Sequence, residues 1–83
     1  MLPVYYVYHL ISLKNPEKKY LGYTTDIENR LKTHNQGGSI YTCDDKPWEL
    51  IVLHCFKSKD KALAFEKYLK SGSGVAFAKK RLW

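Results

Sequence analysis

Side chains that can act on a phosphate or a proton lie close together in the first half of the chain. Tyr20 and Gly22 close a short strand-like segment, and Arg30 and His34 follow on a helix-like segment. Residues four apart lie on one face of an α-helix, so Arg30 and His34 should point in the same direction. A phenol, a bare glycine and two cationic groups would form a compact polar site, which needs one acid from elsewhere.

Glu66 is the candidate for that acid. It lies in an apolar helical stretch beside Phe65 and Leu69. An acid among apolar positions is seldom buried without a partner, although Glu66 could equally lie on the exposed edge of the helix. By contrast, the residue pattern alone favours a structural role in the sheet for His9 and His54.

Length and composition indicate one folded domain that spans residues 1–83. The chain has 83 residues, of which 45% are hydrophobic and 14% aromatic, which excludes a disordered segment. No apolar run reaches the roughly 18 residues that a membrane span needs, and the first residues lack the basic region of a signal peptide. We therefore expect a cytoplasmic protein without a membrane partner.

The net charge of +6 is concentrated in the last third of the chain. Residues 57–83 carry eight basic and two acidic side chains, whereas six of each cancel in residues 1–56. Such a region favours a polyanion partner, most often nucleic acid, although a solvated helix face is an equal alternative. Lys79, Lys80 and Arg81 are the candidate phosphate contacts.

The two cysteines, Cys43 and Cys55, fit no common metal spacing. A zinc site with His34 or His54 is an alternative, but the paired C-x-x-C arrangements of zinc sites are absent from the sequence. Two reduced thiols, with Cys55 in a strand, are the preferred interpretation.

The pattern predicts strands and helices in the order β-β-α-β-α-α. The strands are rich in Val, Ile and Tyr, and two of them are apolar on both faces, which predicts a sheet with helices on both sides. Trp48, Leu50, Val52, His54 and Phe56 are assigned to one face of the third strand. The predicted strands are 3–12, 19–23 and 48–56, and the predicted helices are 26–36, 59–70 and 75–83.

Local signals set the predicted ends of these elements. Residues 25–28 have the S/T-x-x-E form of a capping box, so the first helix should begin at Asp26 and end at Gly37-Gly38. Ser58 should cap the second helix, and residues 71–74 should end that helix and separate it from the third. The polar segment 39–47 is predicted to be a loop whose Tyr41 and Thr42 could reach the site.

These motifs together resemble the GIY-YIG nuclease superfamily. Tyr6-Val7-Tyr8 matches the first triplet and Tyr20-Leu21-Gly22 the second, followed by Arg30, His34 and the later Glu66. The resemblance covers essentially the whole chain and points to small stand-alone bacterial members, close in size to the nuclease domain of the UvrC excision-repair subunit. It implies an α+β fold, a three-stranded antiparallel sheet flanked by helices.

The resemblance also implies a reaction, the hydrolysis of a DNA phosphodiester with one Mg²⁺ or Mn²⁺ ion. Glu66 would hold the metal, Arg30 would bind phosphate oxygens, and Tyr8 or Tyr20 would orient or deprotonate the attacking water. His34 would share a proton with a tyrosine or bind the phosphate. Gly22 would allow a close approach of backbone or substrate. DNA is favoured over RNA, with other repair proteins as possible partners.

Two departures from the family pattern leave other functions open. Tyr23 stands where some members carry a lysine, and residues 67–83 contain no asparagine to match the one that many members carry after the glutamate. A nucleic-acid-binding module that cleaves poorly or not at all is therefore the second hypothesis. A domain that joins a partner protein through its sheet edge or an apolar surface is the third.

Overall fold

The computed structural model describes residues 3–83, so Met1 and Leu2 of the predicted domain lie outside the described residues. The three strands form one antiparallel sheet in the order β2-β1-β3, which confirms the predicted α+β fold and the β-β-α-β-α-α order. The elements are β1 (Tyr5–Ser12), β2 (Lys19–Thr24), α1 (Ile27–Asn35), a 3-10 turn (Cys43–Asp45), β3 (Trp48–Phe56), α2 (Lys59–Leu69) and α3 (Gly72–Arg81).

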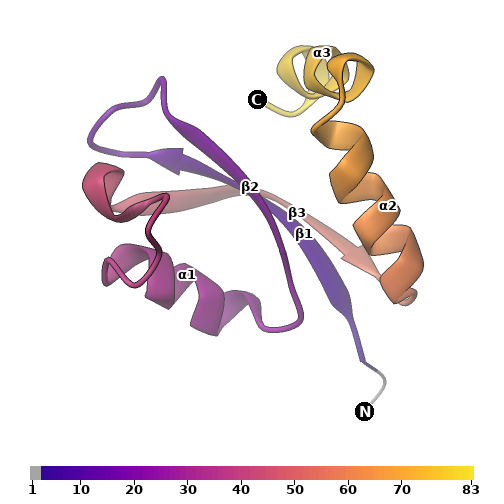
Figure 1. Cartoon of the computed structure of the whole chain (residues 1–83), viewed down its shortest axis with the longest axis horizontal. Helices are drawn as coiled ribbons and strands as arrows, with labels where there is room; N and C mark the ends of the chain where they lie inside the picture. Colours follow the sequence, from indigo (N-terminus) through magenta and orange to yellow (C-terminus); the bar gives the residue numbers. More distant parts are fainter. Residues whose placement is uncertain (1–2) are drawn as a thin grey trace.

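Helices cover both faces of the central strand β1. Figure 1 shows α1 on one side of the sheet and α2 with α3 on the other. Tyr8 and Leu10 pack on the α1 side, and Val7 packs on the α2 and α3 side. Neighbouring residues of a strand point to opposite faces, so β1 contributes to two separate cores. Apolar residues on both faces of β1 thus correctly predicted a covered strand.

The prediction for β3 is wrong in one respect, because a β-bulge changes its faces. The register of the pairing with β1 shifts between His9 and Leu10. His9 pairs with Val52 and Leu10 pairs with Leu50, which leaves Ile51 without a paired residue on β1. A bulge re-aims the side chains that follow it. Trp48 and Leu50 therefore lie on the α1 side, whereas Val52, His54 and Phe56 lie on the other side.

The bulge also leaves part of β3 uncovered. Ile51 and Leu53 are more than a third exposed, and Cys55 is exposed as well. Helices on both sides were predicted for the whole sheet, but α1 covers only the Trp48 end of this edge strand. Both cysteines are free thiols, and Cys55 lies in a strand as predicted.

Two of the predicted helix starts need correction. Asp26, not Thr25, is the N-cap of α1, and its side chain accepts a hydrogen bond from the Asn29 backbone N–H. Asp and Thr are both good caps, so adjacent candidates compete. Residues 72–74 form the first turn of α3 because Ser71 caps that helix. Ser58 caps α2 and α1 ends before Gly37, both as predicted.

No helix in the part of the chain that the structure describes is long and apolar enough to cross a membrane.

A pair of histidines, His9 and the partly buried His54, lies on the α2 and α3 side of the sheet. The Nε2 atoms of His9 and His54 lie 2.9 Å apart, and His9 is completely buried. Burial, with a smaller effect of His54, lowers the pKa of His9 from 6.5 to about 4. Burial also lowers the pKa of His54. Both side chains are therefore neutral in the folded protein near pH 7, in agreement with a structural role.

This pair should make the protein sensitive to mild acid. Between pH 6.5 and about pH 4 the unfolded chain binds a proton at His9 that the folded chain does not bind, so stability falls as the pH falls. The loss from His9 should be about 3 kcal/mol, at about 1.4 kcal/mol per pKa unit. Urea unfolding at about pH 7 and about pH 4.5 measures it. His9→Gln should show a clearly smaller loss, and an equal loss in both proteins would contradict this origin.

Candidate active site

Tyr8 and Gly22 form the base of the site, on the α1 side of the sheet. They are direct partners in the antiparallel pairing of β1 with β2. The Tyr8 ring lies across β2 at this point, because a Cβ atom on residue 22 would overlap its hydroxyl oxygen and Cζ. The glycine therefore makes room for the tyrosine, and Tyr8 is completely buried.

His34 connects Tyr8 to the loop before β3. Its Nε2 lies 2.9 Å from the Tyr8 hydroxyl, and its Nδ1 lies 2.8 Å from the Thr42 hydroxyl. Burial, with a smaller contribution from the charge of Arg30, lowers the pKa of His34. A neutral imidazole has one N–H donor and one acceptor. The three side chains can therefore form a continuous hydrogen-bonded chain.

The loop is held in place by Trp48 and Asn35. The Trp48 indole N–H donates to the Thr42 carbonyl over 2.9 Å, and the Asn35 side-chain amide donates to the Trp48 carbonyl over 3.2 Å. Ile27 and Leu31 pack α1 against the same core. These contacts fix the Thr42 hydroxyl beside His34.

Tyr20 and Arg30 lie on the solvent side of Tyr8. The Tyr20 ring is half-buried, with its centre 4.8 Å from that of His34 and 6.1 Å from that of Tyr8. Contacts with the hydroxyls of Tyr8 and Tyr20 raise the pKa of Arg30. The guanidinium of Arg30 is exposed, and it lies close enough to both tyrosines to stabilise a negative charge on either phenol oxygen.

Burial keeps Tyr8 protonated. Its pKa rises from 10.0 to about 12, mainly through loss of hydration, while hydrogen bonding to Arg30 acts in the opposite direction. The charges of Tyr20 and Glu66 raise it further. Tyr8 therefore enters any reaction as a neutral phenol that can donate to His34.

Glu66 reaches the site from α2. Its charge is close enough to raise the pKa of Tyr8, and its side chain is 21% exposed. The carboxylate pairs with Lys70 one helical turn later, at 3.4 Å between Nζ and Oε2. The lysine is mostly exposed, so this pair is weak and can open. Glu66 is thus a half-buried acid with a replaceable partner.

The residues present suit a metal ion held by one carboxylate. Among residues 3–83 no three or more His, Cys, Asp or Glu side chains gather as a metal cage would require. Mg²⁺ often takes one or two carboxylates and completes its octahedron with water and phosphate oxygens. Glu66 could hold such an ion, and the charge of the ion would replace that of Lys70.

The structure brings together four of the predicted catalytic residues, Tyr8, Tyr20, Arg30 and His34, and places Glu66 on α2, where its charge raises the pKa of Tyr8. It also places Gly22 among them, for a reason that differs from the expected one. The glycine admits the ring of Tyr8, not the substrate. Tyr41 is exposed and points away from the core, but Thr42 reaches the site as predicted.

The basic cluster of α3 lies elsewhere. Lys79, Lys80 and Arg81 are exposed in the last turn of α3, on the opposite side of the sheet from α1 (Figure 1). A role in binding phosphate stays a prediction, and it would require nucleic acid that extends beyond the site itself.

Two supporting residues were missed by the sequence analysis. Asn35 and the indole N–H of Trp48 hold the loop through contacts between separate segments, 13 residues apart for Asn35 with Trp48 and 6 apart for Trp48 with Thr42. The helical spacing that places Arg30 beside His34 does not include Asn35, so it predicts no partner for Asn35. The only sequence signal for a supporting role was a polar residue at the end of α1.

The hydroxyl of Thr42 should contribute more to stability and cleavage than the volume of its side chain does. Thr42→Val keeps the shape but leaves His34 Nδ1 buried without a partner, which should cost about 1–3 kcal/mol of stability. If cleavage depends on the orientation of His34, its rate should fall about tenfold. Thr42→Ser restores the hydroxyl and should recover most of both losses. Urea unfolding and a cleavage assay measure them, and equal behaviour of the valine and serine variants would refute the role.

The profile of the GIY-YIG catalytic domain matches residues 4–79. The chain belongs to the GIY-YIG family. The match includes every residue of the site, from Tyr8 on β1 to Glu66 on α2. The resemblance inferred from the two triplets and from Arg30, His34 and Glu66 is thereby confirmed.

Relatives fall into two groups. A UPF0213 protein of Haloquadratum walsbyi is 41% identical over 67 residues, which cover 77% of this chain and 75% of the relative. The UPF0213 protein YazA of Bacillus subtilis is 46% identical over 52 residues, 61% of this chain and 52% of the relative. The structure-specific endonuclease subunit SLX1 of Candida dubliniensis is 40% identical over 78 residues, 84% of this chain but 27% of that protein.

A solved structure supports the fold. The solution NMR structure of the UPF0213 protein BH0048 from Bacillus halodurans aligns with a TM-score of 0.55 and 32% identity, and covers 93% of this chain and 83% of that one. The same arrangement of strands and helices therefore exists in a small relative.

Proposed function

We propose that this chain is a metal-dependent endonuclease that hydrolyses phosphodiester bonds in DNA. The observation that carries the proposal is the grouping of Tyr8, Tyr20, Arg30 and His34, with the charge of Glu66 acting on Tyr8 from α2. Membership of the GIY-YIG family and the SLX1 endonuclease relative support it. The remaining support is chemical, since each residue type suits one task in phosphodiester hydrolysis.

Arg30 meets the first requirement, which is positive charge beside the phosphate. A phosphodiester is negatively charged and repels the nucleophile, and charge increases on its oxygens as the water attacks. The guanidinium is exposed and planar, so it can bind two non-bridging oxygens at once. It also contacts both tyrosines, so a phosphate bound to Arg30 would lie next to them.

Tyr20 is the tyrosine that meets the attacking water. It is half-buried and faces solvent, whereas Tyr8 is completely covered. Tyr20 would orient the water and accept its proton while Arg30 stabilises the negative charge. The chain of Tyr8, His34 and Thr42 would hold the Tyr20 ring and Arg30 in position from below. This choice between the two tyrosines follows from burial alone.

Glu66 would hold one Mg²⁺ or Mn²⁺ ion, which supplies positive charge for the leaving oxygen. Its carboxylate is accessible, and its pairing with Lys70 can be exchanged. Protein groups would perform the other tasks. Arg30 would bind the phosphate, Tyr20 would orient the water, and the buried residues around Tyr8 would exclude water from the inner side of the site.

The substrate should be chosen by its structure and not by its sequence. The matched catalytic domain occupies residues 4–79, and the SLX1 relative is a structure-specific endonuclease subunit. We expect a role in repair or DNA processing in the cytoplasm, with other repair proteins as potential partners.

A panel of labelled substrates tests this choice. Flap DNA, a four-way junction, linear duplex and single-stranded RNA of matched sequence are incubated with the protein in Mg²⁺ or Mn²⁺. Branched DNA should be cut faster than linear duplex, and RNA should be cut least. Preferred cutting of RNA, or equal cutting of every DNA, would overturn the assigned substrate class.

A further inference from the structure

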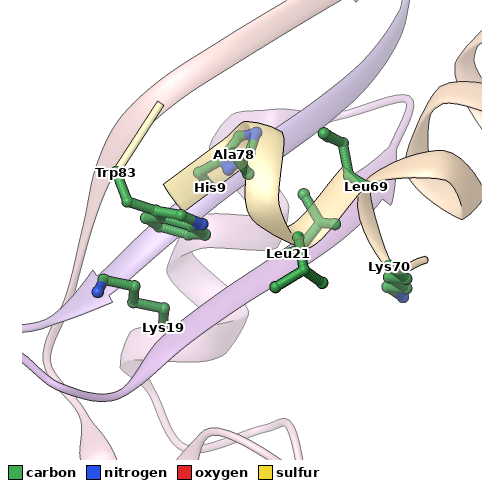
Figure 2. A pocket seen from close by; sticks show the side chains of 8 residues that line it. His9, Lys19, Leu21, Leu69, Lys70, Ala78 and Trp83 are labelled. Carbon is green, nitrogen blue, oxygen red and sulfur yellow. The ribbon is translucent and has the colours of Figure 1, made fainter. Parts of the chain in front are cut away.

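The second face of the sheet carries a pocket that the nuclease site does not use. It has a volume of about 270 Å³ and lies between β1, β2, α2 and α3. Tyr8 and His9 are consecutive in β1 and point to opposite faces, so the sheet separates the pocket from Tyr8. Figure 2 shows Lys19 and Trp83 at one end of the pocket and Leu69 and Lys70 at the other.

His9 forms part of the pocket wall and carries one ring nitrogen without a partner in the described chain. The residue is completely buried, and its Nε2 is occupied by His54. Its Nδ1 is buried and has no hydrogen-bond partner among the described residues. A buried polar atom without a partner costs free energy, so such an atom beside a cavity indicates a missing partner.

The other residues define the chemistry of that partner. Leu21 and Leu69 supply apolar walls, and the Trp83 ring lies 4.8 Å from the His9 ring, centre to centre. Such walls favour a flat ring. Two lysines and no acid line the pocket, so it favours negative charge.

The two lysines are not equivalent. Lys70 is shared with Glu66, whereas Lys19 forms no ion pair among residues 3–83 and lies 5.6 Å from the centre of the Trp83 ring. Lys19 is therefore the cation that is free to meet an anion, with Trp83 beside it. The volume is slightly below the range of about 300–1,000 Å³ that is usual for drug-sized ligands, so the ligand should be a single ring with one substituent.

We propose that this pocket binds a small planar anion, an aromatic ring that bears one carboxylate or phosphate. The ring lies against Trp83 and the leucines, a ring atom or substituent hydrogen-bonds to His9 Nδ1, and the anionic group meets Lys19. Aromatic carboxylates and aryl phosphates share this chemistry. The pocket lies on the opposite face of the sheet from Tyr8, and it shares Lys70 with the nuclease site through the pair with Glu66.

The two tryptophans allow a direct test by NMR. The indole N–H of Trp83 should report on the pocket, whereas that of Trp48 lies on the other face and is bound to the Thr42 carbonyl. The full chain, labelled with ¹⁵N, is titrated with benzoate, with phenyl phosphate and with inorganic phosphate. Benzoate, phenyl phosphate or both should shift the Trp83 signal to saturation, with a Kd of about 1 mM or tighter. The Trp48 signal should not move.

Variants separate the pocket from a general charge effect. Lys19→Gln should weaken binding about tenfold, and His9→Phe should do the same by removing the polar atom. Lys32→Gln, an exposed lysine on α1, is the matched control and should bind like the parent protein. Lys19 is exposed, so its variant should fold even if His9→Phe does not.

Three results would overturn the proposal. The first is no saturable shift of Trp83 with either ring compound. The second is equal binding of inorganic phosphate, which would mean a cationic surface only. The third is Lys19→Gln binding as tightly as Lys32→Gln.

Discussion

Gly22→Ala should be one of the most destabilising single changes that the chain can carry. The added Cβ would overlap the Tyr8 hydroxyl oxygen and Cζ and would approach Cε1 to 2.8 Å. Tyr8 cannot easily move away, because its ring is completely buried between His34, Tyr20 and the sheet. Overpacking of a core by one methyl usually costs about 1–3 kcal/mol, and the severity of this overlap places the cost at the upper end or above. Urea unfolding measures it.

Gly72→Ala is the matched control. A Cβ at residue 72 would have no neighbour within 4 Å, and the residue begins α3. Alanine is favoured over glycine in helices, by up to about 1 kcal/mol in the interior, so this variant should be as stable as the parent protein or slightly more stable. If the two variants were equally stable, the close packing of Tyr8 over β2 would be incorrect.

Glu66→Gln should remove cleavage almost completely. The amide keeps the size of the side chain but loses the negative charge that would hold the metal ion. A bound metal contributes several kcal/mol to the stabilisation of the transition state, so the single-turnover rate should fall about 10³-fold or more. Stability should change little, because the lost partner Lys70 is mostly exposed. Cleavage of a flap substrate under single-turnover conditions measures the rate.

Glu17→Gln provides the control for Glu66. Glu17 is an exposed acid in the turn between β1 and β2, so its replacement makes the same change of net charge. It should cleave at the parent rate. A Glu66→Gln protein that cleaves as fast as Glu17→Gln would remove Glu66 from the reaction, whatever the fold of the site.

Much of the fold could be predicted because each strand and helix has a strong local pattern. The boundaries of β3 agree with the prediction to the residue, but its faces do not. Ile51 is apolar like its neighbours, so nothing in the sequence marks it as the extra residue of a bulge. The start of α3 was missed for a different reason. Residues 71–74 have the composition of a helix breaker, and the cap provided by Ser71 depends on how α3 packs.

The candidate site was predictable to the extent that it follows helical spacing and the family motifs. Arg30 and His34 were placed together by their spacing of four residues. Thr42 could be suggested but not assigned, because its position depends on a loop that Trp48 and Asn35 hold in three dimensions. The raised pKa of Tyr8 likewise required the structure, since it comes from burial. That burial is what favours Tyr20 as the residue that meets the water.

Nicking of supercoiled plasmid tests the central claim most directly. The purified protein is incubated with plasmid in Mg²⁺, in Mg²⁺ with excess EDTA, and after Mg²⁺ is restored, with Glu66→Gln purified in parallel to exclude a contaminating nuclease. The account predicts nicking that disappears with EDTA, returns with the metal and is absent from the variant. Salt-sensitive DNA binding without nicking, or nicking that survives EDTA, would contradict it. Binding without nicking would favour a nucleic-acid-binding module on the GIY-YIG scaffold.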